Sequence, residues 1–211
     1  MAIINIENHI PSKDDNYFFD CMILMYIFFP YGNYNGYQNN AYNILFGKAR
    51  VAKSNIYVTD VLISEFINTF IRKQYNYLAD KYNYPKDSKH FKEVFKKTDE
   101  YKELISEIKT VLERQIFPCV KRLDSEFSKY SFNHIFDEPE TFDFNDRYYG
   151  LTVEGKSIYI VTNDEDFKNV PNCNIITANK KLIKATQKTT SSSTFNENDA
   201  SPMLSKDITV F

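Results

Sequence analysis

Residues 17–29 read YFFDCMILMYIFF, and Asp20 divides this run into two elements. The segment from Tyr17 to Asp20 is typical of a short buried strand, and the apolar residues after it suit a buried helix that Pro30 ends. The run is too short to cross a bilayer and carries a carboxylate inside it, so we predict that it belongs to the core. A strand that leads through an acidic residue into a helix indicates an α/β protein.

A second unit of the same kind begins after residue 54. Residues 55–58, NIYV, are predicted to form a strand, and Thr59 or Asp60 can cap the helix that follows. The apolar residues of that helix recur at helical spacing. Glu65 falls near its first full turn, where it can point back toward the strand ends and where the helix dipole favours negative charge.

The C-terminal part of the chain supplies two further acidic residues in similar positions. Asp143 can cap a helix that has Asp146 in its first turn. A strand is predicted from residue 157 to Thr162, and Asp164 follows it directly. A further short strand is predicted at residues 174–177.

Four acidic residues, Asp20, Glu65, Asp146 and Asp164, thus lie at strand ends or near helix starts. These positions meet along one edge of a parallel sheet, so we predict that the four carboxylates share one cleft. Carboxylates are hard oxygen ligands suited to Mg²⁺ or Mn²⁺, and several of them would repel each other unless a cation lay between them. Asp20 and Asp164 are expected to be the inner ligands, because strand ends are rigid supports.

Three other residues are predicted to support this site. Thr162 is expected to orient a carboxylate or a water molecule, while Asp143 and Asp166 add carboxylates beside the third and fourth acids. Structural interpretations stay open for all of these acids. Asp143 could simply cap a helix, and Asp166 could form a turn. Asp20 could accept hydrogen bonds from backbone donors, and Glu65 could be an exposed helix residue. Asp146 could be an ordinary first-turn acid, and Asp164 could form a turn.

The remaining segments define the expected domain organisation. Residues 31–40, YGNYNGYQNN, are predicted to be a loop, and residues 41–53 a helix. Residues 86–117 have the pattern of one or two amphipathic helices, with a basic and acidic surface that is either solvated or a guide for nucleic acid. A domain over 1–184 with a helical insertion at about 72–135 is predicted. The Ser/Thr/Asn-rich tail, 185–211, is expected to be flexible, with DITVF as a terminal edge strand.

The composition restricts the classes of protein to be considered. With 211 residues the chain is long enough for a full core, and its 16 Tyr and 18 Phe without Trp make that core aromatic. A net charge of -2 means that a nucleic acid would have to be held by a local patch or through metal. An odd number of cysteines and the absence of a basic, apolar leader favour a cytoplasmic location and no membrane contact.

In order along the chain, FFD at Asp20, ISE at Glu65, FDFND at Asp146 and VTNDEDF at Asp164 resemble the PIN domain family of metal-dependent nucleases. The resemblance spans most of the chain, with NIITANKKLI closing the fold. It implies a three-layer α/β/α sandwich with a central, mostly parallel sheet and a helical insertion that compact members lack. It also implies that the four acids are catalytic metal ligands.

The function implied by this resemblance is Mg²⁺- or Mn²⁺-dependent hydrolysis of RNA, as in the toxins of toxin-antitoxin pairs. RNA is then the substrate, and an antitoxin protein and a second copy of the chain are candidate partners. The sequence departs from the family pattern after the first acid, where Cys21 and Met22 replace a small hydroxyl residue and Asn. This departure leaves open an alternative function, a catalytically weak or inactive module that binds RNA or protein.

Other classes of enzyme have less support in the residues. A phosphatase of the haloacid dehalogenase type would need a second Asp two positions after the first, and position 22 is Met. There is no Gly-rich phosphate loop, which argues against use of ATP or a dinucleotide. The three histidines, His9, His90 and His134, show no ligand spacing, so zinc is disfavoured.

Overall fold

The computed structural model describes residues 1–31, 37–124, 127–133 and 143–184. Within these residues the protein is an α/β structure built on a six-stranded sheet with the strand order β1-β6-β5-β2-β3-β4. Every pair of neighbouring strands is parallel. The strands are β1 (Ile3–Asn5), β2 (Asn16–Phe19), β3 (Asn55–Val58), β4 (Lys121–Arg122), β5 (Ile158–Val161) and β6 (Asn174–Thr177).

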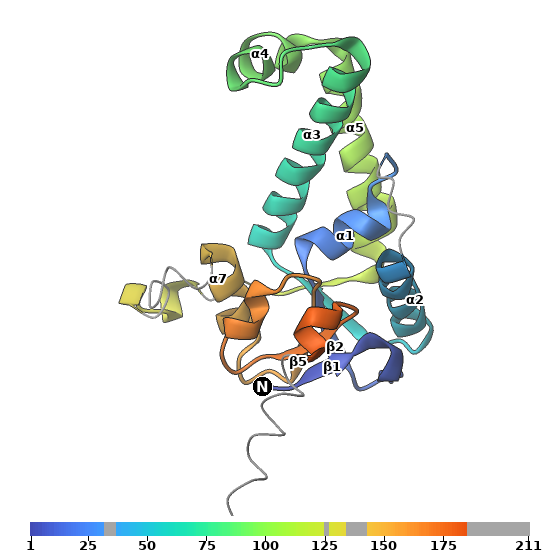
Figure 1. Ribbon diagram of the computed structural model, residues 1–211, viewed down its shortest axis with the longest axis vertical. Helices are drawn as coiled ribbons and strands as arrows, with labels where there is room; N and C mark the ends of the chain where they lie inside the picture. The colour runs from blue at the N-terminus through green and yellow to red at the C-terminus, as the bar shows by residue number, and fades with distance from the viewer. Residues whose placement is uncertain (32–36, 125–126, 134–142, 185–211) are drawn as a thin grey trace, which may run out of the picture.

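The helices lie between these strands (Figure 1). The α-helices are α1 (Cys21–Phe28), α2 (Tyr37–Val51), α3 (Asp60–Tyr82), α4 (Ser88–Glu93), α5 (Asp99–Val111) and α7 (Phe144–Val153). Shorter helical segments are η1 (Ile6–Asn8), η2 (Phe95–Lys97), the π-helical η3 (Leu112–Ile116), η4 (Phe117–Cys119), η5 (Phe127–Lys129) and η6 (Asp166–Asn169).

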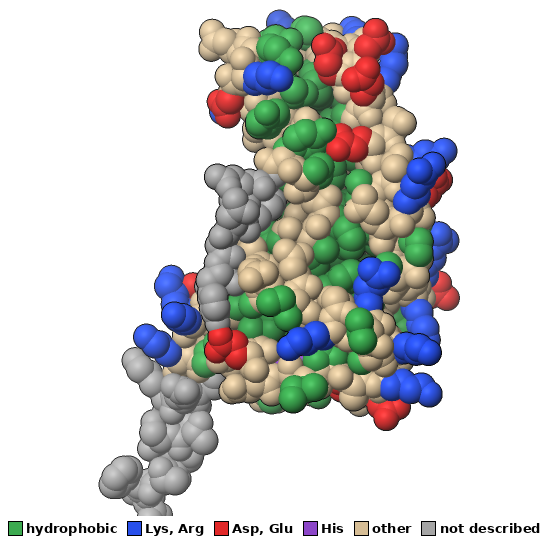
Figure 2. Space-filling view, turned by 90° about the vertical axis from the view of Figure 1, so that its right-hand side faces the viewer, with side chains coloured by type: hydrophobic (Ala, Val, Ile, Leu, Met, Phe, Trp, Pro, Cys, Tyr) green, Lys and Arg blue, Asp and Glu red, His purple; other side chains and the backbone are tan. Residues whose placement is uncertain are grey.

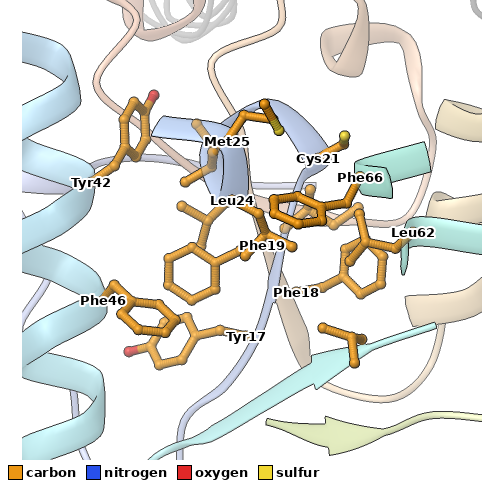
Figure 3. Close-up of a cluster of buried hydrophobic side chains, with 14 of the residues drawn as sticks. Tyr17, Phe18, Phe19, Cys21, Leu24, Met25, Tyr42, Phe46, Leu62 and Phe66 are labelled. Atoms are coloured by element: carbon orange, nitrogen blue, oxygen red, sulfur yellow. The ribbon is translucent and has the colours of Figure 1, made fainter. Parts of the chain in front are cut away.

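The central strand β2 explains why helices cover both faces of the sheet. Side chains of a strand alternate between its two faces. Phe19 packs on Phe46 of α2 (Figure 3), with ring centroids 5.3 Å apart. Phe18 packs on Tyr149 of α7 at 5.0 Å on the other face. Both phenylalanines are almost fully buried. The fully apolar start of the 17–29 run therefore belongs to a strand that is buried on both sides, as parallel strands usually are.

The predicted strands are confirmed, and two strands were not predicted. β2, β3, β5 and β6 match the predicted segments to within one residue at each end. β1 is a three-residue strand at one edge, and β4 consists of two exposed residues at the other edge. Such short edge strands carry almost no apolar pattern, which is why the sequence did not indicate them.

The helix α2 begins earlier than the sequence predicted. It starts at Tyr37 rather than at residue 41, because polar residues in a first helical turn can face solvent without opposing helix formation. The helix ends at Val51, and Lys53 adopts a left-handed conformation with φ of 60°. Residues 32–36 of the predicted loop, the tail 185–211 and the terminal DITVF strand lie outside the described residues.

The predicted insertion forms an arm in its first half. The second half of α3 and the helix α5 run side by side away from the sheet, and α4 lies at the outer end (Figure 1). α3 is continuous through residue 72, so the arm begins inside a helix. Residues 121 and 122, which fall within the predicted insertion, belong to the sheet as β4.

Figure 2 shows the charged side chains on one face of the molecule. On the face in Figure 2, Asp and Glu gather toward the outer end of the arm, and Lys and Arg are spread along one edge of the body. Lys and Arg also lie at the outer end of the arm, so both signs of charge are present there. Among the residues that the structure describes, no helix combines the length and the apolar character needed to cross a membrane.

Candidate metal and catalytic site

The candidate site lies at the point in the sheet where successive strands are added on opposite sides. From β2 the chain continues to β3 on one side, and from β5 it continues to β6 on the other. β2 and β5 are neighbours, and their carboxyl ends meet at this switch point, which is where open α/β sheets bind ligands. Asp20 directly follows β2, and its backbone N–H donates to the carbonyl of Val161, the last residue of β5, at 3.0 Å.

Thr162 connects the first and the fourth acid. Its hydroxyl donates to Oδ2 of Asp20 at 3.0 Å and accepts a hydrogen bond from the backbone N–H of Asp164, also at 3.0 Å. Thr162 is fully buried. The hydrogen bond that the sequence predicted for Thr162 is therefore present, and it fixes the Asp20 carboxylate against the end of β5.

Asp164 occupies an exposed turn after β5. Its Oδ1 accepts from the backbone N–H of Asp166, the first residue of η6, at 3.0 Å. Asp164 is thus a turn former and a candidate ligand at the same time. Asp166 is exposed, and its observed contact is the backbone donation to Asp164.

Glu65 is held by two side chains of α7. Tyr149 donates its hydroxyl to Oε2 of Glu65 at 2.5 Å, and Asn145 donates its side-chain amide to the same oxygen at 3.2 Å. Asn145 and Tyr149 are four residues apart, so they lie on one face of the helix. Glu65 also lies beside Cys21: after burial, the charge of Glu65 and a side-chain hydrogen bond to it raise the pKa of the Cys21 thiol.

Asp146 is presented by the capped start of α7. Asp143 caps this helix as predicted, accepting from the backbone N–H of Asp146 at 3.0 Å. Asp146 itself is half-buried. The helix is held against the body because Tyr148 and Tyr149 are almost fully buried in the core.

Electrostatics show that the four acids belong to one cluster. Burial, opposed by the Thr162 hydrogen bond and reinforced by the charges of Glu65 and Asp164, raises the pKa of Asp20 to about 7. Burial and neighbouring negative charges together raise the pKa of Asp146 to about 8. The charges that add to this shift are those of Asp143, Asp20, Asp164 and Glu65. Each of the four acids therefore acts on another through its charge, although they come from four separate parts of the chain.

The donor set suits a hard divalent cation. It consists of carboxylate oxygens, and none of the ion pairs recorded between described residues involves the four acids. The side chains are not arranged as a finished coordination shell. Among the described residues, no three His, Cys, Asp or Glu side chains converge closely enough to hold an ion. Binding would require Glu65 or Asp164 to turn inward from its present hydrogen bonds.

The ranking of the ligands differs from the sequence prediction. Asp20 is buried, Glu65 and Asp146 are half-buried, and Asp164 is exposed. Asp164 lies three residues beyond Val161, the last buried position of β5, so the turn carries it outward. By burial, Asp20 is the innermost of the four acids and Asp164 the outermost.

Sequence reasoning missed the residues that hold Glu65. Asn145 directly precedes Asp146 in FDFND, and Tyr149 follows at helical spacing, so a polar face on α7 was the available signal. From the sequence, Cys21 is only a departure from the family pattern after the first acid. Its thiol donates to the hydroxyl of Thr69 on α3 at 3.9 Å, and burial followed by the charges of Glu65 and Asp20 raises its pKa.

Comparisons with protein-family models, with curated proteins and with solved structures give no match to this chain.

Proposed function

We propose that this protein is a PIN-like endoribonuclease that uses Mg²⁺ or Mn²⁺ to hydrolyse phosphodiester bonds. The observation that carries the proposal is the mutual electrostatic influence of Asp20, Glu65, Asp146 and Asp164 at the switch point between β2 and β5. A cluster of like charges at this place gains most from a divalent cation. The order of the acids and their positions in the fold agree with the family resemblance.

The protein's own side chains have distinct roles in this proposal. Thr162 orients Asp20, and Tyr149 with Asn145 holds Glu65 in the position from which it would turn toward a cation. A bound Mg²⁺ or Mn²⁺ supplies a water molecule of lowered pKa and neutralises charge on the leaving oxygen. Because burial and like charges raise the pKa values of Asp20 and Asp146, both carboxyl groups must lose their protons before they bind a cation.

The departure at residues 21 and 22 has a structural counterpart. The side chain of Cys21 donates toward α3, so it does not hold Asp20. Asp20 is held instead by Thr162 and by the backbone N–H of Cys21. These two donors perform the orienting role that the family assigns to the missing hydroxyl, which favours an active enzyme over an inactive module.

Cleavage of a mixed RNA pool tests the proposal. The parent protein should cut RNA with Mg²⁺ or Mn²⁺ and lose this activity with a chelator. Asp20→Asn and Asp164→Asn should reduce the rate at least about hundredfold, since both remove a ligand charge without a change of shape. Asp14→Asn, an exposed aspartate in a distant turn, is the control and should cut like the parent. Unchanged cleavage by Asp20→Asn would reject the assignment.

The alternative function is a binding module without catalysis. The chemistry of Cys21 favours it, because a buried thiol replaces a polar group beside the first acid. The module would bind RNA in the same assay without cutting it under any metal condition. A toxin role with an antitoxin partner, and a homodimer, stay predictions of the family resemblance.

A further inference from the structure

Glu65 is engaged by uncharged hydrogen-bond donors from two other helices. Its Oε2 accepts from the Tyr149 hydroxyl at 2.5 Å and from the Asn145 side-chain amide at 3.2 Å, and both donors belong to α7. The thiol of Cys21, at the start of α1, forms a further hydrogen bond to Glu65. The carboxylate of Glu65 is therefore satisfied by the protein without a cation.

The shortest of these hydrogen bonds comes from a buried residue. Tyr149 is only 1% exposed, and Glu65 is the recorded acceptor of its hydroxyl among the described residues. The ring of Tyr149 packs on Phe18 of β2, which fixes the hydroxyl in place. A buried hydroxyl that loses its acceptor costs free energy, because little water reaches it as a replacement partner.

Asp164 is held less firmly than Glu65. It is exposed, and its Oδ1 accepts from the backbone N–H of Asp166 at 3.0 Å. Water can replace the carboxylate as acceptor at an exposed turn, so an inward rotation of Asp164 costs little. Of the two acids whose rotation would complete the site, Glu65 therefore carries the larger cost.

We infer that Tyr149, assisted by Asn145, restrains Glu65 and thereby lowers the affinity of the site for a divalent cation. This inference rests on the proposed function and describes a regulation of the same site. A cation that recruits Glu65 has to break the hydrogen bond from Tyr149, so the two interactions compete for one carboxylate. Tyr149 is a positioning residue, because it acts on the cation only through Glu65.

The sign of the effect of Tyr149 on cation binding separates this restraint from a supporting role. If Glu65 bound the cation from its present position, Tyr149 would support a ligand, and its loss would weaken binding by about 10–100-fold. If Tyr149 restrains Glu65, the loss of its hydroxyl strengthens binding.

Calorimetric titration with Mn²⁺ at pH 8 measures this sign. Tyr149→Phe removes the hydroxyl and keeps the buried ring. Its dissociation constant for Mn²⁺ should be at least about tenfold lower than that of the parent, since the hydrogen bond that is removed has a charged acceptor. Tyr75→Phe is the matched control. It removes the hydroxyl of another buried tyrosine, which contacts the Pro85 carbonyl and His90 in the arm, and should bind Mn²⁺ like the parent.

Thermal denaturation gives a second readout, which a merely structural role of Tyr149 would not change. With chelator, Tyr149→Phe should unfold at a lower temperature than the parent, because it lacks the hydrogen bond. With saturating Mn²⁺ this difference should shrink or reverse, since tighter binding stabilises the variant more. Equal differences in both conditions would mean that the hydrogen bond persists beside the bound cation, and would overturn the inference.

The restraint and the metal site fail in different ways. Equal or weaker Mn²⁺ binding by Tyr149→Phe, with binding by the parent, would overturn the inference and leave the metal site in place. Binding by Tyr149→Phe alone would support the restraint. Absence of binding by every protein would remove the metal site, and the restraint with it.

Discussion

At the scale of single residues, Thr162 is the polar side chain that connects the two strands of the site. It is fully buried, and its one hydroxyl serves both Asp20 and the backbone of Asp164. A residue of this kind contributes both to stability and to the position of the two acids. Its two contacts can be removed by a substitution that keeps its shape.

Thr162→Val is expected to lower the free energy of unfolding by about 1–3 kcal/mol, because it leaves buried polar groups without a partner. It should also raise the pKa of Asp20 further, since the lost hydrogen bond opposes the existing shift. Urea denaturation measures the first effect and carboxyl NMR titration the second. Thr162→Ser keeps the hydroxyl and should retain most of the stability. Equal stability of the two variants would contradict the role of this hydrogen bond.

The raised pKa values predict how stability depends on pH without metal. Asp20 and Asp146 titrate near pH 7 and pH 8 when folded and near about 4 when unfolded, so the folded protein binds more protons in between. The contribution of these two groups is complete below about pH 4 and is lost as the pH rises through their folded pKa values. The free energy of unfolding should therefore fall across this window.

The comparison with Asp146→Asn isolates this effect. With chelator present, the variant should be more stable than the parent at pH 8.5, by at least about 1 kcal/mol, and similar to it at pH 4. Urea denaturation at both pH values gives the two differences. A variant that is less stable than the parent at pH 8.5 would show that the Asp146 charge is not repelled by its neighbours.

At the scale of elements, α7 carries Asn145, Asp146 and Tyr149, and its position depends on Gly150. A Cβ atom built on Gly150 would lie 2.2 Å from a methyl group of Val170, which is a clash. Val170 directly follows η6 and is fully buried, so it has little room to move. The close approach of α7 to this segment is possible because residue 150 has no side chain.

Gly150→Ala should destabilise the protein by about 1–3 kcal/mol through overpacking and shift α7 away from the site. Gly47→Ala is the matched control. Gly47 lies in α2 with nothing within 4 Å of its added Cβ, so this change should stabilise by about 0.5–1 kcal/mol. Thermal denaturation of both variants measures the contrast. A neutral or stabilising Gly150→Ala would contradict the packing of α7.

The arm is held together at its outer end by aromatic side chains. Phe95 is buried and packs on Tyr75 at 4.9 Å between ring centroids, on Tyr101 at 5.7 Å and on Phe91 at 5.9 Å. The hydroxyl of Tyr75 also meets Nδ1 of His90 at 2.9 Å. These contacts join α3, α4 and α5 without involving the sheet.

Phe95→Ala is therefore expected to loosen the arm locally, with a cost of about 3–5 kcal/mol for the lost packing. Amide hydrogen exchange should become faster in residues 88–97 and stay unchanged in β2 and β5. Val94→Ala removes a neighbouring, half-exposed side chain and should change neither region. Faster exchange throughout the sheet would mean that the arm and the body unfold together.

The sequence predicted those elements that have a strong pattern. The four inner strands carry apolar runs, and the caps at Thr59 and Asp143 are formed by residue types that favour capping. β1 and β4 were missed because two or three residues at a sheet edge show no periodicity. The start of α2 was misplaced because tyrosine, glutamine and asparagine are compatible with a loop and with a first helical turn.

The candidate site was predictable in its members but not in its detail. The positions of Asp20 and Asp146 follow from the strand-helix pattern, which brings distant residues to one edge. The exposure of Asp164 and the hydrogen bond from Tyr149 to Glu65 depend on how the turns and α7 pack. Those contacts arise from tertiary structure, which the sequence pattern does not contain.

At the scale of the whole molecule, the net charge of -2 does not describe how charge is distributed around the candidate site. The carboxylate cluster at the switch point repels phosphate, and Arg72 lies exposed further along α3. A divalent ion at the cluster would turn the repulsion into attraction. Substrate binding and metal binding are then linked through the same carboxylates.

Calorimetric titration with Mn²⁺ at pH 8 tests the central claim that the four carboxylates share one divalent cation. The parent protein should bind Mn²⁺ with a dissociation constant below about 1 mM and release protons as it does so. Asp20→Asn and Asp146→Asn should each weaken this binding at least about tenfold, while Asp14→Asn should bind like the parent. Absence of binding by the parent at millimolar Mn²⁺, or equal binding by all four proteins, would contradict the shared site.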